Sequence, residues 1–571
     1  MKTKSLVPIF ALLLAVVPTT AATKPNVLFI AVDDLNDWIG CLGGHPQSVT
    51  PNFDRLAANG MLFTNAHCTA PSCNPSRTAI MSGRSPDRTG MYNNAQKMRD
   101  VMPDEVLLPK YFSNHGYWSA GSGKLLHYVI DPQSWDEYFP EKSKDDPFPR
   151  TFLPEKRPLS LPRGGPWQYN ETDWGPLNVS DEEAGGDWLV SDWIGQQLRK
   201  KHDKPFFLAC GIYHPHEPWF VPAKYFEKFP LESIQLPPGY LEGDLDDVPE
   251  AGRKLARNRY FPHIQAHGQW KQAIQSYLAS INYADAMLGR VLNALEQGPN
   301  NDSTVVVLWS DHGWHLGEKE HWQKYTGWRV CTRVPLMVNL PPGASEALPE
   351  GVKPGGRCDQ AVGLIDLFPT LTDLCGLPKK ASNDGRSLVP LLRGDAPDPE
   401  AVAITYLSDG KSLAISGKDW RYIRYADQSE ELYHIATDRF EHDNLAGIPA
   451  HAAKLAEFRK RVPKNMVPMP GIKVADLIAL DWHPHREGEE IPVSKPDGSP
   501  MRLAFVNERA EVLKFFRVEP GGAHTEAGRV APGATVETQG SPGSVWEVTD
   551  DKGRPLGYFI VDDRAARAVI R

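Results

Sequence analysis

The chain has 571 residues, of which 41% are hydrophobic and 23% charged, and its formal net charge is -9 at pH 7. This length exceeds that of one typical domain, and the composition is that of a soluble globular protein with enough apolar residues for a large core. The negative charge argues against nucleic acid as a partner. An anionic substrate would therefore have to be attracted by a local basic pocket and not by the whole surface.

The N-terminus has the features of a secretory signal peptide. Lys2 and Lys4 precede an apolar run, Leu6–Val17, which is too short to span a bilayer as a helix. Small residues follow, so we expect a signal peptide over residues 1–22, cleaved near Ala22. An uncleaved anchor is the alternative. We expect a periplasmic or secreted protein that has no membrane segment after cleavage.

Three continuous apolar runs predict strands that are buried on both faces, namely Asn26–Val32, Phe206–Cys210 and Thr304–Trp309. Helical patterns lie between them, as at 53–59 and 277–296. Strands that alternate with helices predict a mostly parallel sheet sandwiched by helices. In such sheets ligand groups gather beyond the carboxyl ends of the strands. Each run leads to a polar cluster at that end.

The pattern of apolar and polar residues changes in the last third of the chain. We assign residues 23–395 to a catalytic domain and 396–465, with its short alternating runs, to a smaller α+β subdomain. Residues 466–501 are rich in proline and charge and are expected to form a linker. Residues 502–571 contain short strand patterns separated by turns, which predicts an appended all-β sandwich.

Acidic residues end two of the predicted strands. Asp33 and Asp34 follow the first, and Asp311 with His312 follows the third. Carboxylates that gather in one place repel each other, and a bound cation removes that repulsion. Carboxylate oxygens suit calcium or magnesium, while the histidine leaves manganese or zinc open. The alternative is ordinary turn chemistry at a strand end.

Cys73 is the strongest candidate for a reactive residue. Pro75 and a predicted helix start place this cysteine near a positive helix end, and Arg77 adds a fixed charge for an oxyanion. The segment by itself indicates only a candidate reactive thiol, and a structural cysteine is the alternative. The chain has seven cysteines, so at least one has no disulfide partner, and the absence of a CxxC pair argues against a zinc-thiolate site.

Cys73-x-Pro75-x-Arg77, followed by Ser82-Gly83-Arg84, resembles the signature of the type I sulfatases. The segments 26–34, 123–127, 310–313 and 365–371 are similar to further motifs of that family, in the same order, so the resemblance covers residues 24–465. It implies an alkaline-phosphatase-like fold with one calcium ion, held by Asp33, Asp34, Cys73, Asp311 and His312.

The resemblance also implies that a formylglycine-generating enzyme oxidises Cys73 to formylglycine. Hydrated, this aldehyde is a geminal diol, in which one oxygen attacks sulfur and the second hydroxyl then expels sulfate. Further implied site residues are the cations Arg77, Lys124 and Lys324 and the histidines His127 and His216. His127 would assist the hydrate. His216, with Lys324, would hold the sulfate and protonate the leaving alkoxide.

The subgroup that the chain most resembles is that of the iduronate-2-sulfatases, which implies a sulfated carbohydrate as substrate. Three features carry this resemblance: the spacing of Lys124 and His127, the segment 215–218, and the segment 314–324. His214 lies beside His216, and the flanking prolines favour His216. We give His45, His115, His315 and His321 no catalytic role, and Glu318 is a candidate for lining the pocket.

Two other functions stay open from the sequence. A phosphomonoesterase or phosphodiesterase of the same α/β superfamily would share the fold and the metal acids but would not need Cys73. A sulfated-glycan binding protein with an inactive site would use the β module for affinity. That module, Arg502–Arg571, resembles the β-domain of the von Hippel–Lindau tumour suppressor.

Overall fold

The computed structural model describes residues 24–144, 146–154, 172–258, 260–341, 356–471, 473–496, 501–561 and 565–571. The expected signal peptide, residues 1–22, lies outside these ranges. Within them, no helix combines the length and the apolar character that crossing a membrane requires.

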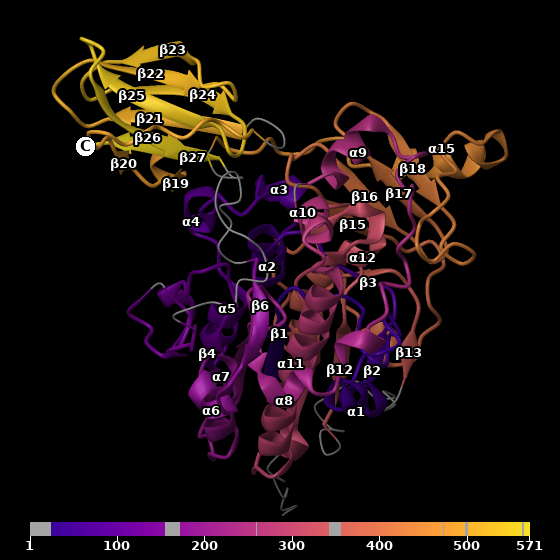
Figure 1. The fold of residues 1–571 in the computed structure, drawn as a ribbon. Helices are drawn as coiled ribbons and strands as arrows, with labels where there is room; N and C mark the ends of the chain where they lie inside the picture. The colour runs from indigo at the N-terminus through magenta and orange to yellow at the C-terminus, as the bar shows by residue number, and fades with distance from the viewer. Residues whose placement is uncertain are drawn as a thin grey trace, which may run out of the picture.

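A mainly parallel sheet of eight strands forms the centre of the molecule (Figure 1). Its order is β13-β2-β12-β9-β1-β7-β4-β5. The bounds are β1 Asn26–Val32, β2 Met61–Phe63, β4 Trp118–Gly123, β5 Glu137–Phe139, β7 Phe206–Ile212, β9 Thr304–Ser310, β12 Leu336–Asn339 and β13 Arg357–Cys358. β12 is antiparallel to both of its neighbours, β9 and β2.

Helices cover both faces of this sheet because its strands are apolar on both sides. Leu28, Ile30 and Val32 of β1 pack into one core with α1 Pro51–Asn59, α7 Asp187–Leu198 and α11 Trp270–Glu296. The alternate residues Val27, Phe29 and Ala31 pack into the other core with α2 Cys73–Ser82, α5 Leu108–Asn114 and α13 Leu367–Leu374. This period of two is that of a strand buried on both faces. The expected α/β class is confirmed.

A second, antiparallel sheet follows in the chain. Its strands run in the order β15 Ala403–Tyr406, β16 Leu413–Ser416, β17 Arg421–Arg424 and β18 Glu430–Tyr433. The helix α15 Ala452–Arg461 packs on one face through Leu455 and Phe458. The other face packs on the α/β body, where Ile423 and Tyr433 share a core with Trp328.

The C-terminal residues form two packed sheets around their own core. One has the order β19-β27-β21-β24 and the other β20-β26-β25-β22-β23. Their bounds are β19 Ile478–Ala479, β20 His483–Pro484, β21 Met501–Asn507, β22 Leu513–Val518, β23 His524–Val530, β24 Thr535–Gly540, β25 Val545–Asp550, β26 Pro555–Ile560 and β27 Ala566–Ile570. The segment 466–501, expected as a linker, thus contributes β19 and β20 to these sheets.

Shorter elements connect the main ones. The strands among them are β3 Ala66–His67, β6 Trp174–Leu177, β8 Trp219–Pro222, β10 His315–Leu316, β11 Trp322–Gln323 and β14 Val362–Gly363. The helices are α3 Pro86–Thr89, α4 Met98–Val101, α6 Asp181–Ala184, α8 Ala223–Phe226, α9 Glu250–Ala256, α10 Tyr260–Ala266, α12 Arg329–Thr332 and α14 Val389–Leu392.

Candidate active site and metal centre

The carboxyl ends of four adjacent strands bring the candidate residues together. β9, β1, β7 and β4 are parallel neighbours, so their ends meet at one edge of the sheet. Asp33 follows β1, Lys124 follows β4, His216 lies just beyond β7, and Asp311 follows β9. The site therefore lies where ligands bind in open α/β sheets.

Cys73 lies at the first position of α2, fully buried at the centre of this group. Its Sγ is 3.2 Å from Lys324 Nζ, 3.3 Å from His312 Nε2, 3.7 Å from Lys124 Nζ and 4.0 Å from Asp34 Oδ1. Burial alone would raise the pKa of the thiol, but Lys124, Lys324 and His312 outweigh it and hold the pKa well below its usual value. The sulfur thus occupies a strongly electropositive site.

The other six cysteines differ from Cys73 in this respect. The structure describes all seven, and none forms a disulfide. Burial is the main reason why the pKa of each of the other six lies above that of a free thiol. Cys73 is therefore the one cysteine of this chain whose surroundings favour the thiolate.

Arg77 holds the acidic residues in place. Its Nε donates to Asp311 Oδ2 at 2.8 Å and its Nη2 to Asp33 Oδ1 at 2.8 Å, while Nη1 donates to the main-chain oxygen of Lys124 at 2.5 Å. Lys124 Nζ lies 2.5 Å from Asp33 Oδ2. Each of these side chains is fully buried, so removal of one partner would leave an uncompensated charge.

A metal ion fits this group of donors. Ligand atoms of Asp34, Cys73, Asp311 and His312 all lie within 4.8 Å of one another. Burial raises the pKa of Asp311 to about 7 although Arg77 opposes the shift, so this carboxyl lacks sufficient positive charge nearby. Carboxylate oxygens with one imidazole suit a hard divalent cation. Asp34 has the left-handed φ of 56°, a strain that is typical of functional sites.

Two neighbouring histidines have different surroundings. His216 Nε2 lies 3.6 Å from Asp34 Oδ2, and its Nδ1 lies 2.6 Å from the main-chain oxygen of Glu217. Burial lowers the pKa of His216, but Asp34 outweighs it, so the pKa lies above that of free histidine. His214 instead bonds Asp187, with Nδ1 at 2.7 Å from Oδ2. The geometry therefore joins His216, and not His214, to the acidic cluster.

His127 and Lys324 complete the cluster around Cys73. Burial lowers the pKa of His127, although the neighbouring Cys73 opposes the shift, which favours the neutral ring. Lys324 Nζ bonds Asp34 Oδ1 at 2.9 Å and Oδ2 at 3.1 Å. His321 Nε2 lies 2.9 Å from the main-chain oxygen of Lys324, a contact that positions the backbone of the lysine.

Three aromatic side chains beside this cluster, Tyr128, Phe148 and Tyr213, were not predicted from the sequence, and we call them the aromatic wall. The Phe148 ring meets the rings of Tyr128 and Tyr213 edge-on, at centroid distances of 5.4 and 5.2 Å. Lys124 Nζ lies 4.7 Å from the Tyr128 centroid and 5.4 Å from the Tyr213 centroid. Tyr128 is 37% exposed and has a left-handed φ of 52°. In the sequence, only the position of Tyr128 directly after His127 could have indicated that this tyrosine lies at the site.

Comparisons with known proteins show which proteins this chain is similar to. The sulfatase family model matches residues 25–377, and a model named N-sulphoglucosamine sulphohydrolase, C-terminal, matches residues 317–467. A sulfatase of Formosa agariphila is 39% identical over 453 residues, which are 77% of this chain and 87% of that protein. Human iduronate 2-sulfatase is 32% identical over 395 residues, which are 62% of this chain and 69% of that protein.

A solved structure gives the same fold at lower identity. The structure of BT4656 in complex with its substrate D-glucosamine-2-N,6-O-disulfate superposes with a TM-score of 0.60 at 21% identity, over 77% of this chain and 97% of that one. This likeness supports the alkaline-phosphatase-like fold. The family model covers more than half of the chain and includes Cys73, Lys124 and Asp311, and the protein therefore belongs to the sulfatase family, whose members hydrolyse sulfuric esters.

Proposed function

We propose that this sulfatase removes sulfate from a sulfated sugar, in the manner of an iduronate-2-sulfatase, with a formylglycine made from Cys73 as its nucleophile. The observation that carries the proposal is the position of Cys73 Sγ, which has two lysine ammonium groups and one imidazole within 3.7 Å. In the mature enzyme the hydroxyls of the hydrated aldehyde take the place of this sulfur. The cations then surround the sulfate that the hydroxyl attacks.

The reaction proceeds in two displacements. One hydroxyl of the hydrate releases its proton to solvent, and its oxygen bonds to sulfur as the bond from sulfur to the sugar oxygen breaks, while His216 donates a proton to that leaving oxygen. His127 next removes the proton of the second hydroxyl, the bond from carbon to the sulfated oxygen breaks, and sulfate leaves with the aldehyde restored. Exchange with solvent then removes the proton from His127 and returns one to His216. Water then hydrates the aldehyde again.

The charges of the two histidines fit these roles. Although burial opposes the shift, Asp34 raises the pKa of His216, which favours the protonated ring that an acid needs. Burial lowers the pKa of His127, so this ring is free to accept one. Lys124 and Lys324 face the sulfate oxygens, whereas Arg77 acts as a positioning residue because its nitrogens already bond Asp33, Asp311 and the main chain.

A calcium ion would be held by Asp33, Asp34, Asp311 and His312 together with the residue at position 73. When bound, it supplies a Lewis acid that stabilises negative charge on oxygen. The oxygen-rich donor set supports calcium over a softer metal. The same ion would neutralise the carboxyl of Asp311, whose pKa burial raises to about 7.

The substrate proposal rests on the relatives and on the aromatic wall. Human iduronate 2-sulfatase and the sulfatase solved with a disulfated glucosamine are similar to this chain. Tyr128 and Phe148 offer aromatic faces beside Lys124, and the apolar face of a sugar ring packs well on such side chains. We further propose that the protein is exported and that a formylglycine-generating enzyme matures it.

The test combines a mass measurement with an assay. The protein is produced with a formylglycine-generating enzyme, and the mass of the peptide containing Cys73 is measured by mass spectrometry. Conversion lowers its mass by about 18 Da, because oxygen replaces sulfur and two hydrogens are lost. Converted protein should release sulfate from sulfated uronic acid or hexosamine, and the Cys73→Ser variant should not.

The alternatives predict different outcomes. A phosphoesterase would hydrolyse phosphate esters with an unmodified Cys73, and a binding protein would retain a sulfated glycan without releasing sulfate. An intact thiol in the presence of a working generating enzyme would refute the proposed nucleophile.

A further inference from the structure

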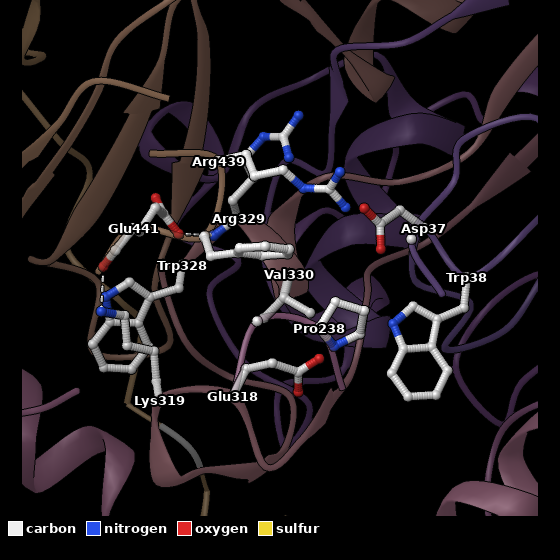
Figure 2. A pocket seen from close by; sticks show the side chains of 13 residues that line it. Asp37, Trp38, Pro238, Glu318, Lys319, Trp328, Arg329, Val330, Arg439 and Glu441 are labelled. Atoms are coloured by element: carbon white, nitrogen blue, oxygen red, sulfur yellow. Dashed lines mark hydrogen bonds between the residues drawn. The ribbon is translucent and has the colours of Figure 1, made fainter. Parts of the chain in front are cut away.

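A pocket outside the catalytic cluster lies between the α/β body and the antiparallel subdomain (Figure 2). Residues of four separate segments line it: 37–44 after β1, 238–239, 318–330 up to the start of α12, and 439–441 after β18. None of the candidate catalytic or metal residues is among its lining residues. The pocket is therefore a second concave site and not an extension of the first.

Two arginines line one side of the pocket, Arg329 partly buried and Arg439 exposed (Figure 2). Arg329 forms no ion pair within the described part of the chain, and its Nε is buried without a hydrogen-bond partner. Burial, reinforced by Arg333, lowers the pKa of Arg329 to about 9, although the nearby carboxylates of Asp37 and Glu441 oppose the shift. Arg439 contacts only the main-chain oxygen of Gly43 at 3.4 Å and the ring of Phe440, among the residues described.

The acids nearby are already paired with other cations. Asp37 binds Arg333, and Glu441 Oε1 accepts from Arg421 Nε at 2.6 Å. Both carboxylates lie near Arg329 and offset part of its charge, but each is shared with another cation. An anionic group of a ligand would supply the missing charge.

Glu318 lies across the pocket from the arginines (Figure 2). It is only 6% exposed, and its Oε2 accepts from the main-chain nitrogen of Leu316 at 2.7 Å. The next two residues, Lys319 and Glu320, have left-handed φ angles of 55° and 48°. Consecutive strained residues persist where the surrounding structure holds them, and such strain gathers at binding sites.

We propose that this pocket binds an acidic sugar residue. Its carboxylate or sulfate group bonds Arg329 and Arg439, and one of its hydroxyls donates to Glu318 on the opposite side. Trp38 and Phe440, which also line the pocket, supply apolar contact for the ring. The identity of the ligand as a sugar rests on the proposed function, whereas the need for an anion rests on the arginines alone.

The experiment uses sodium glucuronate, an acidic sugar that carries no sulfate ester. Its binding to the full-length protein is measured by titration calorimetry, with glucose and inorganic sulfate as comparison ligands. We expect glucuronate to bind more tightly than either, because only glucuronate offers both the anion and the ring. Arg329→Gln should weaken its binding by about 10-fold or more, since a charged hydrogen bond is lost.

Two variants control this experiment. Lys324→Met disables anion binding at the catalytic cluster and should leave glucuronate binding unchanged. Arg393→Gln removes an exposed arginine outside the pocket and should also have no effect. Glucuronate binding that survives Arg329→Gln, or that disappears in Lys324→Met, would overturn the assignment, as would equal affinity for inorganic sulfate.

Hydrolysis of nitrophenyl sulfate by the same proteins separates this inference from the proposed function. If no sulfate is released but glucuronate binds through Arg329, the second site stands and the proposed function fails. If sulfate is released but wild-type protein does not bind glucuronate, the proposed function stands and the second site is refuted.

Discussion

Glu318→Gln should stabilise the protein at alkaline pH and have little effect in acid. Glu318 is almost fully buried and forms no ion pair within the described residues. Burial raises the pKa of its carboxyl from 4.5 to about 7, so the folded protein keeps it protonated where the unfolded chain does not. Glutamine preserves the size of the side chain and the oxygen that accepts from Leu316.

The size of the effect follows from the two pKa values. Between pH 4.5 and about 7 the folded state binds more protons at this position than the unfolded state, so the free energy of unfolding falls as the pH rises. Above pH 7 the loss is complete and amounts to about 3 kcal/mol, at 1.36 kcal/mol for each pKa unit. Replacement by glutamine removes this loss. The difference between variant and wild type should therefore grow from near zero at pH 4.5 to about 3 kcal/mol at pH 8.

Urea unfolding followed by tryptophan fluorescence measures this difference at a series of pH values. Because the chain has several folding units, midpoints of the transition that reports the α/β body are compared. Glu227→Gln, at an exposed position, controls for the general loss of one acidic side chain. If wild type and Glu318→Gln unfold alike at pH 8, or differ by the same amount at every pH, the reasoning from burial is refuted.

Three further predictions concern catalysis. His216→Ala should lower kcat on a sugar sulfate by about 10²-fold or more, and much less on nitrophenyl sulfate, whose leaving group needs no proton; equal losses on both would contradict its role as the acid. Chelation should lower both the melting temperature and the rate of sulfate release, and added calcium should restore them, because Asp34 and Asp311 lose their cation; an unchanged rate would contradict a metal requirement. Tyr128→Ala should raise KM for a sugar sulfate by about 10-fold and Tyr128→Phe should not; steady-state kinetics that show equal KM values would exclude stacking on this ring.

Local patterns in the sequence predicted three of the eight strands of the central sheet, β1, β7 and β9. Val27–Val32 is apolar at every position, a pattern typical of a strand buried on both faces, and the structure has β1 over Asn26–Val32. The C-terminal sandwich was predicted less completely. β23 and β24 are polar and mostly exposed, so they lack the apolar alternation by which a strand is recognised. The strands with buried side chains, such as β25, were visible in the sequence.

The sequence by itself determined the motif that carries the resemblance to the sulfatases, since Cys73, Pro75 and Arg77 lie within one turn and a half of a single helix. Residues that are three or four positions apart in a helix are close in space, so their spacing in the sequence is enough to identify such a motif. The flanking prolines favoured His216 over His214, but only the tertiary structure shows His216 beside Asp34, which is 182 residues earlier in the chain. Only the tertiary structure shows, too, that Arg329 forms no ion pair with an acid among the described residues. Both observations depend on how distant segments pack against each other, and a single sequence has no periodic pattern from which that packing can be predicted.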